Sequence, residues 1–325
     1  MGRQPPVLRL FSKAVGGACA TMLAVSLLVY LTLEFNGADV AAKVLGPFSA
    51  PDQRYAWMRE HGYLEPLVLR YLRWLANFVA GNWGTSTYYK EDILALVAPR
   101  LASSSILAAG ALIVIVPFSI VLGVISGVSE GSALDRAVSS AAILATSLPE
   151  FASAALLTAL LVFWLNWLPG TSTMSTGFSW RELVLPIAVL SLSSAGYIAR
   201  ITRASIIDVM ASPFVHTARM KGCSWRRVVL RHALRHALIA PVTLVLLQIP
   251  WILSNVVIVE VFFAYKGLGT LLYEASLNSD IRLIEACSMV SVIAVVSTQV
   301  LADVIHGRLN PRIAPWADDA LRSRA

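Results

Sequence analysis

The sequence predicts an all-α membrane protein with six transmembrane helices, on two observations. The chain of 325 residues is 57% hydrophobic and only 14% charged, and its mean hydropathy of +0.69 exceeds that of soluble domains. Six separate stretches are also apolar enough to cross a bilayer, for which a helix needs about 20 mostly apolar residues. The net charge of +7 is spread in short clusters between these stretches, without the basic stripe and interleaved aromatic residues of a nucleic-acid-binding protein. We therefore expect no nucleic-acid partner.

The six stretches are distributed along the whole chain. The first, 14–33, and the second, 101–129, carry no charge, and the third, 137–165, carries only Glu150, which follows Pro149. The remaining three are 183–199, 237–259 and 286–302. The positive start before the first stretch also fits a signal peptide, but the length of the stretch and the lack of a small-x-small cleavage site favour a retained anchor.

The orientation is predicted by the distribution of Lys and Arg. They concentrate in residues 1–13, in the connection after the fourth stretch and in the tail 307–325, whereas the connections on the other side carry few. Because cytoplasmic loops are enriched in Lys and Arg, both termini and the basic connection are predicted to be cytoplasmic. Residues 34–100, where bases and acids nearly balance, would then form an extracytoplasmic insertion, and 101–306 the transmembrane core.

One segment of the insertion has the periodicity of an amphipathic helix. Arg70 and Arg73 fall on other faces than its apolar positions, which are Leu64, Val68, Tyr71, Leu72 and Leu75. The pattern predicts a helix that lies against the protein or the membrane surface and is ended by a turn at 81–84, GNWG.

The sequence carries no motif of an ATPase, a metalloprotease or a serine hydrolase. The GxxxxGK[ST], HExxH and GxSxG patterns do not occur, so any ATP and Mg must be bound by a partner, and we expect no catalytic residue, metal or cofactor in this chain. His232 and His236 have a spacing that some metal ligands share, but they lack a nearby third ligand and favour a solvated helix. Acidic residues inside the apolar stretches are few, which disfavours an ion- or proton-coupled carrier.

The connection 204–236 holds the most basic segment of the chain, and its residues predict a helix, a sharp turn and a second helix. Pro213 is placed to begin the first helix, Gly222 to end it and Ser224 to cap the second. One face of the second helix would carry Arg227, Arg231 and Arg235. A neighbouring face would carry Trp225, Val228, Val229 and His232. A loop that is only positive-inside needs no ordered turn between amphipathic halves, so the pattern favours a cytoplasmic docking element.

The same segment resembles a motif of a known family. Residues 217–222, TARMKG, followed by 232–235, HALR, and Pro241 are similar to the TARAKG...HALRN...P pattern of the permease subunits of bacterial ABC importers of the oligopeptide/dipeptide type. Further segments resemble the family in the same order: 81–86, GNWGTS; 147–151, SLPEF; 199–205, ARITRAS; and 259–269, VEVFFAYKGLG. The similarity therefore extends over nearly the whole chain.

The sequence departs from the family pattern at several positions. His216 and Thr217 take the places of the acidic residue and the first alanine of the family's EAA loop, so docking would depend on shape and on the flanking bases. Lys266 replaces the proline before Gly267, and residues 281–282, Ile-Arg, replace a Tyr-Pro pair.

The resemblance implies a permease subunit of an ATP-driven importer in the bacterial inner membrane, forming half of a pathway for oligopeptides or dipeptides. Glutathione and nickel chelates are substrates of related systems. The implied partners are a second homologous permease subunit, ATP-binding subunits, an extracytoplasmic peptide-binding protein and membrane lipid. The implied coupling helix lies between the fourth and fifth spans, and the residues that would contact the ATP-binding subunit are Pro213, Phe214, Thr217, Ala218, Arg219, Lys221, Gly222, Trp225 and Arg226.

Polar residues inside the apolar stretches are candidates for the pathway lining, although such groups also bond neighbouring helices. They are Ser191, Ser194, Gln248 and Asn255. Two alternatives to the importer stay open at this point. An ion- or proton-coupled secondary transporter would work alone, and a membrane scaffold or enzyme would not co-purify with an ATPase.

Overall fold

The computed structural model describes residues 6–34, 37–46, 48–175 and 177–309 and confirms the predicted all-α class. Its one bridge between extended segments pairs Thr85 with Asp92. The chain divides into two compact units, residues 1–104 with 266–325 and residues 105–265. Helix α5 (Ile93–Val128) begins in the first unit and continues into the second.

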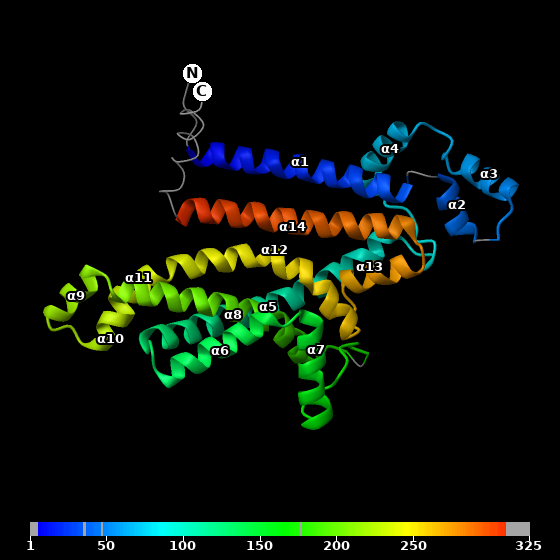
Figure 1. The fold of residues 1–325 in the computed structure, drawn as a ribbon. Helices are drawn as coiled ribbons and strands as arrows, with labels where there is room; N and C mark the ends of the chain where they lie inside the picture. The colour runs from blue at the N-terminus through cyan, green and yellow to red at the C-terminus, as the bar shows by residue number, and fades with distance from the viewer. Residues whose placement is uncertain (1–5, 35–36, 47, 176, 310–325) are drawn as a thin grey trace, which may run out of the picture. The chain divides into compact units, whose positions relative to one another are not determined.

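The first unit is built around two long helices that lie side by side, α1 (Pro6–Glu34) and α14 (Ile281–Leu309) (Figure 1). Its other helices are α2 (Gly37–Leu45), α3 (Pro51–Glu60), α4 (Leu67–Val79) and α13 (Leu268–Leu277). The buried core of this unit joins the start of α5 to α13 and α14 through Ile93, Leu271 and Leu283. The insertion is therefore part of a folded unit that includes the first and last long helices.

The second unit has α8 (Trp180–Met210) at its centre, packed against α6 (Ala133–Ser147), α7 (Glu150–Thr158) and α12 (Ile239–Phe262) (Figure 1). The shorter elements are a π-helix Ala159–Trp164, α9 (Pro213–Met220), α10 (Trp225–Arg227), a π-helix Val228–Ala233 and α11 (Leu234–Ala237). Ile115, Ile198 and Ile252 are buried in the core that the long helices share. Pro186 and Pro250 are both accommodated inside long helices, α8 and α12.

Within the described residues, five helices are long and apolar enough to cross a membrane, or six if one bent helix pair forms a single span, and the sequence predicts six. The five helices are Val15–Glu34, Ile93–Val128, Trp180–Met210, Ile239–Phe262 and Ile281–Ile305. The predicted span 137–165 corresponds to the bent pair, Ala133–Ser147 and Glu150–Trp164, whose two members pass the length and hydropathy test together but are bent by 113°. The break has a local cause, because a residue before proline is pushed out of the helical region, and Leu148 before Pro149 is extended at φ −87°, ψ 128°.

Several observed helices begin earlier or end later than predicted. Helix α5 begins at Ile93 instead of Leu101, since the Asp92 carboxylate accepts a hydrogen bond from the Ala95 N–H at 3.1 Å and caps the helix. Helix α8 continues to Met210, so the first residues of the predicted connection 204–236 are still helical.

The amphipathic helix predicted in the insertion is α4, but it begins at Leu67, after Leu64. Its aromatic residues pack on the last turns of α1, where the ring centroids of Tyr30 and Trp74 lie 5.3 Å apart. Tyr71 stacks on Trp74, and its hydroxyl lies 2.7 Å from Ser26 Oγ. This face of α4 thus contacts the protein.

The turn predicted at 81–84 is confirmed, with positive φ at both Gly81 and Gly84. The segment that follows is held by hydrogen bonds to α13 and to the residue before α14. Asp280 accepts hydrogen bonds from Ser86 Oγ at 2.5 Å and from the Tyr88 N–H at 3.1 Å. The Tyr89 hydroxyl donates to Glu274 at 2.6 Å.

The Tyr89–Glu274 contact predicts a dependence of stability on alkaline pH. Burial of the phenol, followed by its hydrogen bond to the Glu274 carboxylate, raises the pKa of Tyr89 from 10.0 to about 12. The folded state keeps this proton while the unfolded state loses it, so the contribution is complete below pH 10 and is lost as pH rises through about 12. Thermal unfolding of wild type and Tyr89→Phe as a function of pH should show this extra loss in the wild type alone. Parallel curves for the two proteins would contradict it.

Candidate functional site

The connection between α8 and α12 folds as the predicted helix, turn and second helical segment. Helix α9 begins with Pro213 at its first turn, where the missing N–H leaves no unpaired donor, and the Thr217 hydroxyl donates to the Pro213 carbonyl at 2.9 Å. One face of α9 is buried through Val215 and Ala218. These residues pack in a small core with Val228 and Ala233, so the connection has its own hydrophobic centre.

Gly222 ends α9 as predicted. It has a φ of +77°, a left-handed conformation that an L side chain adopts only at a cost. Its N–H donates to the Arg219 carbonyl at 2.9 Å, and the Cys223 N–H donates to the Ala218 carbonyl at 3.2 Å. No atom lies within 4 Å of the position that a Cβ would take. Glycine is therefore needed here for its backbone conformation and not for lack of space.

The second helical segment differs from its prediction in three respects. The Ser224 side chain makes no capping hydrogen bond, and the Ser224 carbonyl instead accepts from the Val228 N–H at 3.0 Å. A π-helix occupies Val228–Ala233, so the expected α-helical register does not hold. Trp225 is also exposed instead of lining the face of buried Val228 and Val229. The three arginines expected on one face are all exposed: Arg227, Arg231 and Arg235.

The outward surface of the connection combines large apolar side chains with bases. Phe214, Met220 and Trp225 have exposed fractions of 43%, 77% and 48%. The Arg219 guanidinium carbon lies 4.5 Å from the centroid of the Trp225 ring, a cation–π contact that brings the charge and the ring together. Lys221 and Arg226 are exposed beside them, and residues 211–238 contain no Asp or Glu. We call the surface formed by Phe214, Arg219, Met220, Lys221, Trp225 and Arg226 the docking surface.

Two sets of polar contacts within the second unit fix helix α8 near this connection. The Ser205 hydroxyl of α8 donates to the Ala237 carbonyl of α11 at 2.7 Å. Two residues earlier in α8, Arg203 donates to both carboxylate oxygens of Asp135, Nε at 2.5 Å and Nη2 at 2.8 Å. The same carboxylate accepts from Ser126 Oγ at 2.5 Å at the end of α5. The Asp135 carboxylate of α6 thus links α6 to both α5 and α8.

The sequence did not indicate the Asp135–Arg203 pair. Arg203 belongs to the predicted cytoplasmic bases and to the family-like segment 199–205, but neither feature identifies its partner, which lies 68 residues away in the chain. The one local signal is the short distance in sequence from Ser126 to Asp135, which is typical of a side-chain contact across a helix–turn–helix.

Comparisons with known proteins bear on the whole chain. Residues 119–315, which include the docking surface and the Arg203 pair, match the family described as Binding-protein-dependent transport system inner membrane component. The chain belongs to this family. It is accordingly the membrane-spanning permease component of a transport system and not the ATPase.

Similar permeases cover almost the full length of this one. The oligopeptide transport system permease protein AppB of Bacillus subtilis is 29% identical over 299 residues, which cover 90% of this chain and 95% of AppB. A putative peptide transport system permease protein of Brucella abortus is 30% identical, with coverage of 94% and 98%. The glutathione transport system permease protein GsiC of Salmonella paratyphi A is 31% identical, with coverage of 93% and 97%.

The four pathway candidates of the permease all lie in the second unit. Ser191 and Ser194 are buried, and Ser191 Oγ donates to the Ala111 carbonyl at 3.4 Å. Ser191 lines a largely apolar cavity of about 570 Å³ between α5, α6 and α8, whereas Ser194, Gln248 and Asn255 are not among its lining residues. Asn255 Nδ2 is buried without a hydrogen-bond partner.

The part of the permease that the structure describes contains no group of three His, Cys, Asp or Glu side chains arranged to hold a metal ion. His236 instead packs on the Phe214 ring, with centroids 5.0 Å apart.

Proposed function

We propose that this permease forms half of the translocation pathway of an ATP-driven importer of short peptides and that the docking surface binds the ATP-binding subunit. The observation that carries the proposal is the division of α9 into two faces. Val215 and Ala218 are buried against the connection's own core, while Phe214 and Met220 are exposed beside the bases. Large apolar side chains exposed next to charges are typical of a protein interface.

The absence of an acid shapes the proposed contact. With His216 in place of the family's acidic residue, the docking surface offers only positive charge, so the matching groove should carry acidic residues around an apolar floor. Phe214 and Met220 would then enter the groove, and Arg219, Lys221 and Arg226 would pair at its rim.

A peptide substrate is supported by the relatives. The names of the similar permeases specify oligopeptides, peptides and glutathione, and glutathione is itself a tripeptide. We therefore propose short peptides, delivered by an extracytoplasmic binding protein, as the cargo. ATP and Mg would be held by the ATP-binding subunits, and a second homologous permease would form the other half of the pathway.

The proposed orientation places both termini in the cytoplasm and the insertion outside. Within the first unit, one cavity is lined both by Glu34, the last residue of α1, and by Glu285 near the start of α14. The two helices therefore run in opposite directions from a shared end, which supports chain termini on the same side of the membrane.

Neighbouring residues on the two faces of α9 provide a matched test of docking. Phe214→Ala should lower transport-coupled ATP hydrolysis about tenfold, as expected for loss of an interface anchor, with little change in thermal stability. Val215→Ala, in contrast, should lower stability by about 1–2 kcal/mol because it removes buried methyl groups. ATPase assays and thermal unfolding of the complex purified through this chain would compare the two.

Each rival account predicts another outcome. An ion- or proton-coupled carrier would transport peptide when reconstituted alone and would be indifferent to Phe214→Ala. A scaffold or enzyme would purify without an ATPase. Either result would overturn the proposal.

A further inference from the structure

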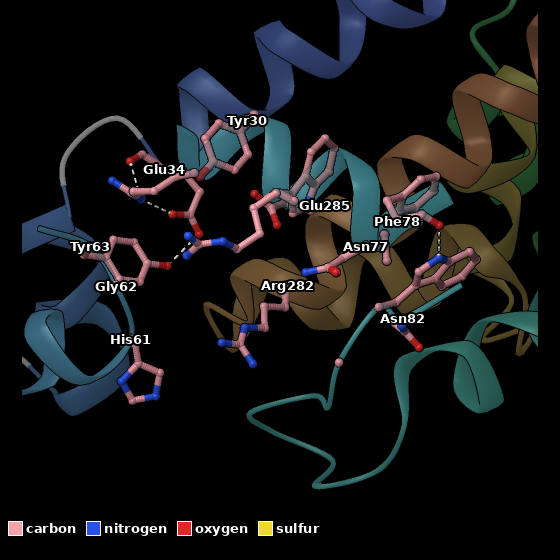
Figure 2. A pocket seen from close by; sticks show the side chains of 16 residues that line it. Tyr30, Glu34, His61, Gly62, Tyr63, Asn77, Phe78, Asn82, Arg282 and Glu285 are labelled. Carbon is pink, nitrogen blue, oxygen red and sulfur yellow. Dashed lines mark hydrogen bonds and ion pairs between the residues drawn. The ribbon is translucent and has the colours of Figure 1, made fainter. Parts of the chain in front are cut away.

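The first unit contains a polar cavity of about 270 Å³ where α1 ends and α14 begins (Figure 2). It is lined by side chains of α1, α4, α14 and the turns at 61–63 and 82–84. In the proposed orientation it lies at the extracytoplasmic end of these helices. Its charged groups are Glu34, Arg70, Arg73, Arg282 and Glu285.

The carboxylate of Glu34 already has partners for both oxygens. Oε1 accepts from the Tyr63 hydroxyl at 2.6 Å, and Oε2 accepts from Arg70 Nη2 at 2.5 Å. Arg70 is further fixed by its guanidinium carbon lying 4.1 Å from the Tyr63 ring centroid. Arg73 in turn pairs with Glu65 at 2.9 Å. Glu34, Arg70 and Arg73 are therefore already paired within the protein.

Glu285 lacks such a set of partners. Its exposed fraction is only 2%, and its Oε1 is buried without a hydrogen-bond partner. No basic side chain in the described residues forms an ion pair with the Glu285 carboxylate. Figure 2 shows the guanidinium of exposed Arg282 directed away from Glu285. A buried carboxylate oxygen left unpaired is costly, which favours a ligand that supplies the missing donor.

The side chains around Glu285 indicate which class of ligand could donate to its carboxylate. Tyr30, Trp74, Phe78 and Trp83 line the cavity, and the rings of Trp74 and Phe78 stack with centroids 5.8 Å apart. Aromatic faces attract organic cations, whereas a metal ion would need more oxygen or nitrogen ligands than one free carboxylate offers. Among the described residues no three His, Cys, Asp or Glu side chains meet to supply them.

We infer that this cavity is a binding site for a primary ammonium group, with the Glu285 carboxylate as its counter-ion and the Trp74 and Tyr30 rings beside it. Two sources share this chemistry, the amino terminus of a peptide and the headgroup of phosphatidylethanolamine. A role in peptide uptake rests on the proposed function, but the binding itself requires neither transport nor an ATPase. A failure of ammonium binding is therefore distinguishable from a failure of the proposed transport function.

Direct binding to the purified full-length chain tests the site. In phosphatidylcholine nanodiscs, saturation-transfer NMR should show saturable binding of alaninamide, which carries a primary ammonium, and none of neutral N-acetylalaninamide. Glu285→Gln should weaken binding roughly 10- to 100-fold, the loss expected for a charge-assisted hydrogen bond. Glu91→Gln, which removes the same charge from an exposed position of the first unit, should bind as wild type does.

The remaining outcomes are also decisive. If phosphatidylethanolamine in the nanodisc abolishes alaninamide binding, the site is an ammonium site occupied by lipid. If alaninamide still binds in nanodiscs that contain phosphatidylethanolamine, the site favours the peptide amino terminus. Absence of saturable binding to the wild type, or equal binding of the two probes, would overturn the inference even if Glu285→Gln did not fold.

Discussion

Gly222→Asp is expected to reduce transport-coupled ATP hydrolysis by tenfold or more while the chain still inserts in the membrane in normal amounts. The reason is local, because the residue has a φ of +77° and closes the turn between α9 and the segment after it. A residue with a Cβ there costs about 1–2 kcal/mol, and less for Asn and Asp, whereas a bias of about 1.4 kcal/mol against the docked conformation is already tenfold. The new carboxylate would also compete for the bases of the docking surface, Arg219 and Lys221, that are proposed to contact the partner.

Two further substitutions separate the backbone effect from the charge. Gly222→Asn keeps nearly the same size but carries no charge and tolerates the left-handed conformation, so it should retain most activity. Gly222→Ala strains the backbone without adding charge and should fall between the two. Because the space around the residue is open, steric clash cannot produce this order. Wild-type coupling in well-inserted Gly222→Asp complexes would remove the argument for an ordered turn.

Gly123→Ala is expected to cause the largest loss of stability. An added Cβ would lie 2.4 Å from the Thr202 Cβ and 2.6 Å from the Ala199 carbonyl oxygen, so α5 and α8 would have to separate. Gly127, one turn later, would place its Cβ 2.8 Å from the Ile206 Cβ. Such overpacking costs about 1–3 kcal/mol of stability. In a membrane, where close packing is a main source of helix–helix association, the loss of stability should lie at the upper end of this range.

Gly17→Ala is the matched control for this substitution. Gly17 also lies inside a long helix, α1, but no atom approaches within 4 Å of its Cβ position, so alanine should leave stability equal or raise it by about 0.5–1 kcal/mol. Thermal unfolding in detergent would compare the two variants. Equal unfolding temperatures would show that α5 and α8 do not pack through their backbones.

Much of this architecture follows from local chemistry and was predictable for that reason. Apolar length defines the helices, Pro213 and Gly222 set the limits of α9, and the glycines at 81 and 84 mark their turn. The helix–turn–helical arrangement of the connection was predictable because its signals are contiguous in sequence. The break before Pro149 was visible as a residue type, but the 113° bend depends on packing in the second unit.

Other features depend on which helices meet, and the sequence does not state this. The spacing of Gly123 and Gly127 is that of a close helix contact, yet only the structure identifies α8 as the partner. Glu285 was missed because the last span was predicted to begin at Ala286, whereas α14 begins at Ile281 and places Glu285 inside the helix. Trp225 was placed on one face with Val228, Val229 and His232 because an α-helical register was assumed through a segment that is a π-helix.

Cross-linking from the docking surface tests the central claim most directly. In a chain with Cys19, Cys223 and Cys287 replaced by Ala, Met220→Cys would carry a benzophenone maleimide at the side chain with an exposed fraction of 77%. Val68→Cys, at a position in the insertion with an exposed fraction of 67%, serves as the control. After illumination of the assembled complex, the account predicts a cross-link to the ATP-binding subunit from position 220 and none from position 68. An intact complex in which position 220 cross-links to no ATP-binding subunit would contradict it.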